Sequence, residues 1–473
     1  MKRKYAAGHN GLPGQDDSGA ISSWYVFSSM GFFPVAGQDV YLIGSPLFDR
    51  SRIRLKNGKT FSVVARRRSA ENIYVQSAKL NGIPIDRAWF RHRELMQGGT
   101  LELIMGSAPS EWGKVQVPPS LTQPPPYTPE DIQAICWNMV DYHLREVYPK
   151  LNYVPVMEGA WTKNAYWNAA TFYTGLWKLY EKTGHAPFFK HMADWGKRER
   201  FTPLKYDPDI ANNHLAAHTW LKMYQETGNK AYLEPSLTEL DRFMRLPYEG
   251  RTEWWWCDLL FMAPPTFALA TAITGDPKYL DFMHEKWVQA TKVLQDPATG
   301  LFFRDAKYVY APDKPDTHGK DGGKVFWSRG NGWVMGGIVR VLERLPESDP
   351  RRSYYIELLQ QMAAGIAPLQ GKDGLWRVSL TDTQNYPLPE TSGTALFCYA
   401  LANGIRNGYL DEATYRSVME RAWEGLLQHI RPDGSLGSVQ RVAHAPEQID
   451  PDHTEPFGLG AFLLAAVEVM GMQ

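Results

Sequence analysis

The chain contains the stretch Ala170-Thr171-Phe172-Tyr173-Thr174-Gly175-Leu176-Trp177-Lys178-Leu179-Tyr180-Glu181-Lys182-Thr183-Gly184, which predicts an apolar helix stopped by Thr-Gly. Glycine readily adopts the left-handed conformation that ends a helix. Similar units recur at 218–228 and 267–276, with weaker copies at 336–345, 395–404 and 458–469. Their spacing of roughly 45 to 70 residues fits one helical hairpin each. Six hairpins predict a closed toroid, with the loops before its inner helices gathered at one mouth.

The composition limits the classes of partner. The chain has 473 residues, with 51 Lys and Arg against 51 Asp and Glu. A net charge of zero gives no overall field toward nucleic acid, an anionic membrane or another polyanion. The 17 Trp and 24 Tyr make the chain rich in aromatic residues, as carbohydrate-handling proteins are, because aromatic faces stack on sugar rings.

The three cysteines, Cys136, Cys257 and Cys398, lack the spacing of a zinc site or a disulfide framework. We interpret them as buried thiols and expect no metal and no cofactor. No segment reaches the roughly 18 apolar residues of a membrane span. Residues 1–9 contain no apolar signal segment, so a cytoplasmic chain is expected as written, and a periplasmic or secreted one if the N-terminus is incomplete. The sequence does not indicate an oligomeric state.

Residues 1–116 predict a smaller domain. Aromatic and small residues alternate over 20–36, a pattern that suits a buried helix ending near Gly31. From residue 38 the period is two, which predicts an antiparallel β-sandwich with hairpin turns at Asn57-Gly58 and Asn81-Gly82. Its strands are expected at 40–43, 52–55, 61–65, 73–76 and 101–104. Residues 117–127 are proline-rich and predict an extended linker, and the helical domain occupies 128–473.

The segment Trp254-Trp255-Trp256-Cys257-Asp258 places one carboxylate against a large aromatic surface. Removing an ionised carboxylate from water raises its pKa, which produces a proton donor usable near neutral pH. Asp is also a favoured N-cap residue, so capping of the next helix is the alternative role of Asp258. The three tryptophans suit either sugar stacking or core packing.

Other segments that enter the inner helices combine aromatic, small and hydrogen-bonding residues: 161–168, 207–218, 327–333, 389–394 and 452–457. Arg329 lies between Trp327 and Trp333, next to Asn331. It fits either a cation stacked on aromatic rings or a guanidinium fork for a sugar carboxylate.

Two further pairs of polar residues are candidates. His214 and His218 are one helical turn apart but lack a third ligand at suitable spacing, so packing or substrate hydrogen bonding is favoured over metal binding. Thr391 and Ser392 are interpreted either as N-cap residues or as sugar-binding residues.

In the motifs Trp254 to Asp258, Trp327 to Trp333 and Glu390 to Thr394, residues 128–473 resemble unsaturated rhamnogalacturonyl and glucuronyl hydrolases, glycoside hydrolase family 105 and its relative family 88. The resemblance implies a mainly α structure, an (α/α)6 barrel. It implies removal of a Δ4,5-unsaturated uronic acid from the non-reducing end of lyase-generated oligosaccharides. An Asp protonates C4, water adds at C5, and the hemiketal opens and expels the aglycone, without a metal or the usual two-carboxylate displacement.

On this resemblance Asp258 is the proton donor, and Trp327, Arg329, Asn331 and Trp333 belong to the uronate-binding motif. His214, His218, Trp254, Thr391 and Ser392 are expected to complete the substrate-binding set. Similar members carry Ala-Asp-Asp before the second inner helix, where one Asp assists catalysis, whereas this chain has Ala211-Asn212-Asn213. An amide cannot act as a base at neutral pH, so either activity is reduced or Asp207 or Asp209 substitutes.

The first 115 residues resemble the C-terminal end of family 92 α-mannosidases, which are calcium-dependent exo-enzymes. The similarity lies in residues 11–19, in Trp24-Tyr25-Val26-Phe27 and in residues 44–49, with Gln15 where Asn is usual. The general acid of those enzymes is absent, so Asp16 and Asp17 are not expected to hydrolyse mannosides alone. The N-terminal resemblance nevertheless makes an α-mannosidase the alternative function. A third is a sugar-binding protein whose catalysis is lost through Asn212 and Asn213.

Overall fold

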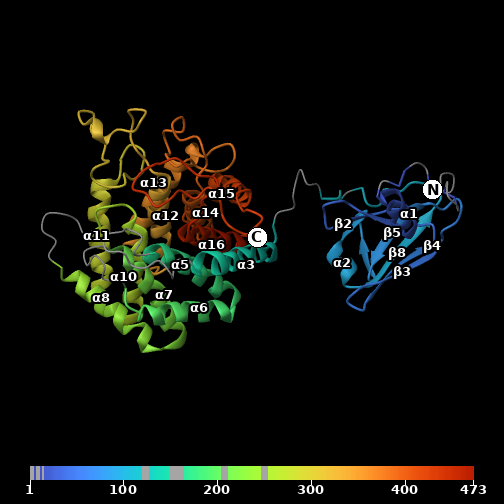
Figure 1. The fold of residues 1–473 in the computed structure, drawn as a ribbon, viewed down its shortest axis with the longest axis horizontal. Helices are drawn as coiled ribbons and strands as arrows, with labels where there is room; N and C mark the ends of the chain where they lie inside the picture. The colour runs from blue at the N-terminus through green and yellow to red at the C-terminus, as the bar shows by residue number, and fades with distance from the viewer. Residues whose placement is uncertain are drawn as a thin grey trace. The chain divides into compact units, whose positions relative to one another are not determined.

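The computed structural model describes residues 5–6, 11–12, 15–16, 18–114, 116–119, 127–149, 165–203, 211–246 and 254–472. The chain divides into two compact units, Met1–Pro126 and Tyr127–Gln473 (Figure 1). Each unit has its own hydrophobic core. Among the described helices, none is long and apolar enough to cross a membrane.

The N-terminal unit contains two sheets that face each other. One has the strand order β1-β2-β7 and the other β3-β4-β8-β5-β6. Phe61 of the second sheet packs against Phe32 and Phe90 of the first, with ring centroids 6.4 and 5.5 Å apart. The elements are α1 (Ala20–Met30), β1 (Phe32–Pro34), β2 (Val40–Ile43), β3 (Arg50–Arg54), β4 (Thr60–Arg66), β5 (Tyr74–Leu80), β6 (Ile83–Ile85), β7 (Trp89–Arg91), α2 (His92–Met96) and β8 (Gly99–Gly106).

The predicted strands and both predicted turns are confirmed. Asn81 and Gly82 have φ 53° and 83° and connect β5 to β6, and Gly58, with φ 79°, lies in the turn from β3 to β4. The strands pair antiparallel, as predicted, except that β4 and β8 run parallel. Each of the unpredicted strands β1, β6 and β7 has only three residues, which is too short for a period of two to appear.

Helix α1 ends where the sequence predicts but is not buried. Gly31 has φ 101°, and its N–H donates to the Phe27 and Ser28 carbonyl oxygens. Trp24 is 40% exposed and Val26 53% exposed. Phe27 packs edge-on against Phe32, which holds one side of the helix on β1. The expectation of a buried helix is therefore wrong, because alternating aromatic and small residues do not show how many sides of a helix are covered.

The C-terminal unit is an (α/α)6 barrel, as predicted (Figure 1). Its inner helices contact their neighbours in chain order, and the last contacts the first, which closes the ring. The inner helices are α5 (Ala165–Thr183), α7 (His214–Thr227), α10 (Pro264–Thr274), α12 (Ser328–Leu342), α14 (Thr391–Arg406) and α16 (Pro456–Met470). Their outer partners, in the same order, are α6 (Ala186–Arg198), α8 (Glu234–Met244), α11 (Lys278–Leu294), α13 (Arg352–Ile366), α15 (Glu412–Leu427) and α3 (Pro129–Tyr142).

Short elements complete the barrel. Helix α9 (Leu259–Met262) precedes α10, a π-helical turn His143–Val147 follows α3, and 3-10 turns lie at Ala211–Asn213, Lys230–Tyr232, Pro315–Thr317 and Ala367–Leu369. Gly228 and Gly275 end α7 and α10 in the left-handed conformation, with φ 69° and 73°. This confirms that Thr-Gly stops α7 and α10, as the repeat predicts.

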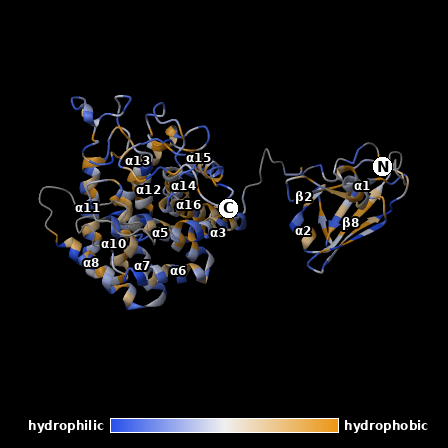
Figure 2. Ribbon diagram, viewed as in Figure 1, coloured by the Kyte–Doolittle hydropathy of each residue, from blue (hydrophilic) through white to orange (hydrophobic). Residues whose placement is uncertain are grey.

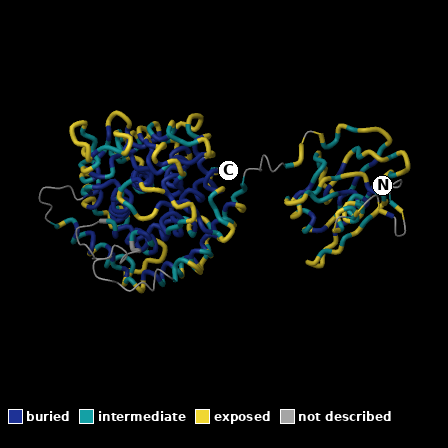
Figure 3. Tube along the Cα trace, turned by 45° about the horizontal axis from the view of Figure 1, so that its top comes forward, coloured by how far each residue is buried: buried dark blue, intermediate teal, exposed yellow. Residues whose placement is uncertain are grey.

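The inner helices form the core of the barrel (Figures 2 and 3). Every residue of α16 is buried. Its one carboxylate, Glu468, is paired with Lys178 at 3.2 Å and Arg406 at 2.7 Å, because a buried charge requires a partner. Cys136, Cys257 and Cys398 are buried free thiols, as predicted, and burial raises the pKa of Cys136 to about 12.

The ring closes at a contact between two glycines. A Cβ atom on Gly175 of α5 would lie 2.4 Å from the Gly460 carbonyl oxygen, and one on Gly460 of α16 would lie 2.2 Å from the Thr171 carbonyl oxygen. The two backbones therefore touch at a distance that any side chain would prevent.

We expect Gly460→Ala to lower the free energy of unfolding of the barrel by about 1–3 kcal/mol. The added methyl group must push α16 away from α5, and chemical denaturation followed by circular dichroism measures the loss. Val293→Ala is the control: Val293 is 45% exposed, so a change within about 0.5 kcal/mol is expected. An unchanged Gly460→Ala protein would show that ring closure does not depend on this contact.

Candidate active site

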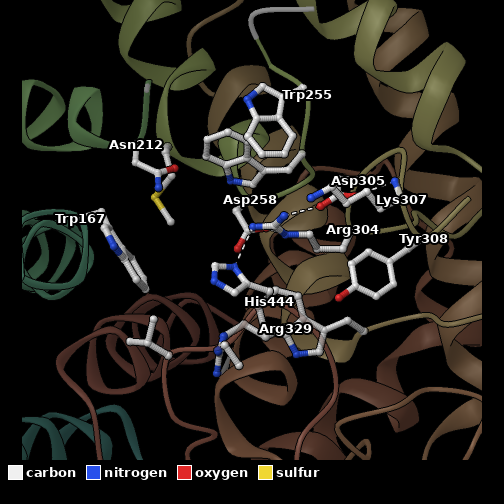
Figure 4. Close-up of a pocket in the computed structure, with 15 residues that line it drawn as sticks. Trp167, Asn212, Trp255, Asp258, Arg304, Asp305, Lys307, Tyr308, Arg329 and His444 are labelled. Carbon is white, nitrogen blue, oxygen red and sulfur yellow. Dashed lines mark hydrogen bonds and ion pairs between the residues drawn. The ribbon is translucent and has the colours of Figure 1, made fainter. Parts of the chain in front are cut away.

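A cavity of about 410 Å³ opens where the loops before the inner helices meet. Trp167 comes from the start of α5, Asn212 from just before α7, Asp258 from just before α9, and Trp327 and Arg329 from the start of α12 (Figure 4). The sequence predicts this mouth from the repeat. The remaining lining residues are Trp255, Trp256, Met262, Arg304, Asp305, Lys307, Tyr308, Val442, Ala443 and His444.

Asp258 is the N-cap residue of α9 by position, but its side chain makes no capping hydrogen bond. The carboxylate is 17% exposed. Burial raises the pKa of Asp258, although the charges of Arg304 and Arg329 and a hydrogen bond from Cys257 oppose the rise. Cys257 Sγ lies 3.5 Å from Asp258 Oδ2. The side chain is therefore available to hold and transfer a proton.

Arg304 lies between two carboxylates (Figure 4). Its Nε is 4.0 Å from Asp258 Oδ2, and its Nη1 forms an ion pair with Asp305. Its Nη2 is 3.0 Å from His444 Nδ1. Asp305 also accepts a hydrogen bond from the Lys307 backbone N–H at 2.7 Å, so it is held in place while Asp258 faces the cavity with fewer partners.

The cavity-lining residues Arg304, Lys307, Tyr308 and His444 lie in segments that no sequence motif indicates as part of a site. Arg304 follows outer helix α11 rather than entering an inner helix, so it carries no repeat signal. A main-chain bridge between Trp256 and Asp305 brings the two segments together, and the Cys257 N–H donates to the Arg304 carbonyl oxygen at 2.8 Å. No local sequence pattern encodes such a long-range pairing.

Arg329 lines the cavity but is only 1% exposed. Its guanidinium carbon lies 4.7 Å from the Trp327 ring and 4.6 Å from the Phe457 ring. Nη1 donates to the Gln440 carbonyl oxygen at 2.7 Å and Nη2 to the Arg441 carbonyl oxygen at 2.9 Å. Arg329 thus fixes the segment that carries Val442 to His444 at the cavity, and burial lowers its pKa.

The cavity lining does not include Asn331, Trp333 or Trp254. Asn331 Nδ2 donates to the Phe302 and Trp327 carbonyl oxygens, both at 3.0 Å. Trp333 is fully buried and packs on Phe261, with ring centroids 4.7 Å apart. Trp254 is also fully buried. These side chains shape the barrel around the site, and their predicted contact with substrate stays a prediction.

The other predicted substrate-binding residues are buried and do not line the cavity: His214, His218, Thr391 and Ser392. Burial lowers the pKa of His214 to about 3, and that of His218 falls well below its ordinary value through burial and Arg340. The N-cap of α14 is neither Thr391 nor Ser392. Glu390 takes that role and accepts hydrogen bonds from the Ser392 and Gly393 N–H groups at 3.0 and 2.6 Å. Thr391 Oγ1 donates to the Gly437 carbonyl oxygen at 2.8 Å.

The two asparagines take different positions. Asn212 lines the cavity, and its Oδ1 is buried without a hydrogen-bond partner among the described residues. Asn213 is 7% exposed and is not part of the lining. Asp207, Asp209 and residues 161–164 lie outside the described residues. Asn212 therefore contributes its side chain to the same cavity as Asp258, while its Oδ1 atom is buried.

The N-terminal unit matches a second family. Residues 1–107 match the glycosyl hydrolase family 92 catalytic domain. An uncharacterized secreted glycosidase of Arthroderma benhamiae is 47% identical over 116 residues, which are 24% of this chain and 15% of that protein. Asp16 accepts hydrogen bonds from the Ser22 N–H and hydroxyl, both at 2.8 Å, and Asp17 lies outside the described residues.

Residues 140–473 match Glycosyl Hydrolase Family 88. The unsaturated 3S-rhamnoglycuronyl hydrolase of Formosa agariphila is 34% identical over 321 residues, covering 65% of this chain and 85% of that protein. A relative of the same name from an Alteromonas species is 32% identical.

Solved structures agree with this match. A glycosyl hydrolase family 88 protein from Bacteroides vulgatus is 28% identical, with a TM-score of 0.65 over 73% of this chain and 100% of its own. A structure titled as a polysaccharide lyase is 30% identical, with a TM-score of 0.63 over 73% of this chain and 98% of its own. With a family match that covers its whole barrel core and a carboxylic acid in the mouth of that barrel, the chain belongs to glycosyl hydrolase family 88 and is a glycoside hydrolase.

Proposed function

We propose that the barrel removes a Δ4,5-unsaturated uronic acid from the non-reducing end of an oligosaccharide by hydrating its vinyl ether. The position of Asp258 carries the proposal. The residue lines the cavity, burial raises the pKa of its carboxyl group, and its side chain makes no capping hydrogen bond. The names of the Formosa and Alteromonas relatives, unsaturated 3S-rhamnoglycuronyl hydrolases, support the same substrate class.

The chemistry begins with the proton of Asp258. The electron pair of the C4=C5 double bond takes this proton at C4, which leaves an oxocarbenium ion at C5. Water adds at C5 and loses its own proton, so a hemiketal forms. The hemiketal opens to a ketone and breaks the bond between C5 and the ring oxygen. The hemiacetal freed at C1 then expels the aglycone.

Arg304 supports the proton transfer. The Asp258 carboxyl group needs its proton before the reaction, and burial keeps that proton by raising the pKa. After transfer the new carboxylate lies 4.0 Å from Arg304 Nε, and an opposite charge at this distance stabilises it. Burial thus favours the proton on Asp258 before the reaction, and Arg304 favours the carboxylate that remains after it.

The cavity fits an anionic sugar. Its cations are Arg304, Lys307 and Arg329, and Lys307 is exposed. The indole rings of Trp167 and Trp255 supply flat faces for a sugar ring. We assign the uronate carboxylate to the Lys307 side of the cavity. The Nη1 and Nη2 atoms of Arg329 already donate to main-chain oxygens, and those of Arg304 already contact Asp305 and His444.

We assign Asn212 to binding the water molecule that adds at C5. Its side-chain amide lines the cavity and can hydrogen-bond that water, but an amide cannot take a proton at neutral pH. Asn212 therefore orients the nucleophile without activating it, and water must lose its proton to another acceptor after the addition.

Asp258→Asn is expected to lower kcat by about two to four orders of magnitude, which is the usual contribution of a proton donor. The amide keeps the shape of the side chain but cannot supply the proton. The assay follows loss of the ultraviolet absorbance of the unsaturated uronide. Asp450→Asn, at an exposed carboxylate paired with Arg441, is the control, and an Asp258→Asn protein with more than a tenth of the parent kcat contradicts the assignment.

Arg304→Gln is expected to move the alkaline limb of kcat/KM to higher pH. Asp258 must be protonated, so the rate falls as pH rises through its pKa, and Arg304 holds that pKa down. Removing the arginine raises the pKa further and extends activity upward in pH. Arg441→Gln removes the same charge from a residue paired with Asp450 and should leave the limb in place. A limb that is unmoved or lower in Arg304→Gln refutes the pairing.

Asn212→Asp is expected to raise kcat, because a carboxylate can accept the proton of the attacking water. The new negative charge in the same cavity as the uronate carboxylate should also raise KM, so the two constants are measured separately. Asn213→Asp is the matched control, since Asn213 does not line the cavity. Equal behaviour of the two variants would show that Asn212 has no special position relative to the water.

A further inference from the structure

The electrically neutral chain consists of two oppositely charged parts. Residues 1–116 contain 16 Lys and Arg against 9 Asp and Glu, a net charge of +7, so the remaining residues carry −7. The total of 51 against 51 conceals this division. The exclusion of polyanionic partners therefore does not apply to the N-terminal unit, because an uneven charge distribution creates a local field that the total does not report.

The positive charge of this unit is ordered on strand β3. Arg50, Arg52 and Arg54 are exposed, while Ser51 and Ile53 between them are partly buried. Side chains alternate along a strand, so the three arginines share one face and repeat every 6.6 Å or so. β3 is an edge strand of the five-stranded sheet (Figure 1). Among the described residues, none forms a hydrogen bond or an ion pair with these three guanidinium groups.

The sheet beside these arginines is polar and almost free of negative charge. Arg54 lies opposite the exposed Thr60, Arg52 opposite the buried Ser62, and Arg50 opposite Val64 of β4. Ser62 lies opposite Thr100 of β8, which is partly exposed. The carboxylate on this part of the sheet, Glu102, pairs with Arg66 at 3.3 Å and lies opposite Lys79 of β5. The face therefore combines a row of guanidinium groups with the hydroxyl groups of Thr60 and Thr100, and its acidic residue is neutralised by neighbours.

We propose that this β3 face, defined by Arg50, Arg52, Arg54 and the adjoining hydroxyl groups of β4 and β8, binds an acidic polysaccharide. Guanidinium groups form paired hydrogen bonds with carboxylates and sulfates. A polymer of uronic acids or sulfated sugars presents such anions at regular intervals, and its hydroxyl groups suit the threonines of the sheet. The choice of a polysaccharide over nucleic acid rests on the proposed function, because lyases release the barrel's substrate from polymers of this kind.

The test measures binding of the full chain to polygalacturonate, with dextran as the neutral polymer and double-stranded DNA as the competing polyanion. Arg52→Gln/Arg54→Gln should weaken polygalacturonate binding about fivefold or more, since each exposed ion pair contributes a few-fold. Arg93→Gln/Lys114→Gln removes the same charge from exposed residues off the β3 face and should change binding less than twofold. Arg52→Lys/Arg54→Lys should bind more tightly than the glutamine variant, because it keeps the charge.

Several results would overturn the proposal. The first is a parent chain that does not bind polygalacturonate, and the second is an equal loss of affinity in the two glutamine variants. The third is a lysine variant that binds no more tightly than the glutamine variant. The fourth is tighter binding to DNA than to polygalacturonate. Turnover of a lyase-generated disaccharide on the same preparations reports on the barrel separately. Unchanged turnover in the Arg52→Gln/Arg54→Gln protein is expected, and a parent chain that binds the polymer without turnover would contradict the proposed function and not this surface.

Discussion

The contact between α5 and α16 closes the barrel, and the position of every residue at its mouth depends on that closure. Gly175 and Gly460 allow the first and last inner helices to touch through their backbones. Closure sets the N-terminal ends of the inner helices around one opening. Asn212, Asp258 and Arg329 come from different hairpins, yet they line a single cavity because the ring brings their segments together.

Within this mouth, the electrostatic balance at Asp258 decides what the cavity can do. Burial beside Trp255 and Trp256 favours the protonated acid, while Arg304 favours the carboxylate. Burial is the larger effect, so the pKa rises. Without Arg304, the buried Asp258 would bind its proton more tightly. Without burial, Arg304 would favour the ionised carboxylate, which has no proton to give. The combination supplies a proton donor and stabilises the base that remains after transfer.

Repetition made much of this structure predictable from sequence. The Thr-Gly stops and apolar helices predicted the barrel and its mouth. Asp258 was indicated by the three tryptophans that precede it, and Asn212 by the resemblance of its segment to related hydrolases; both line the cavity. Arg304 and His444 were not found, because they reach the cavity through long-range main-chain pairing and through contacts with Arg329. Likewise, Glu390 rather than Thr391 caps α14, since hydrogen bonding rather than composition fixes a helix start. The charge on β3 was hidden by a whole-chain total.

Turnover of a lyase-generated disaccharide in deuterium oxide tests the central claim, that Asp258 delivers a proton to C4 of a vinyl ether. An enzyme-held donor protonates one face of the double bond, so the 4-deoxy-5-keto product should carry deuterium at C4 as a single epimer, read by nuclear magnetic resonance during early turnover. An equal mixture of the two epimers would contradict the account. It would mean that the enzyme cleaves the glycosidic bond directly and that the released sugar rearranges afterwards in solution.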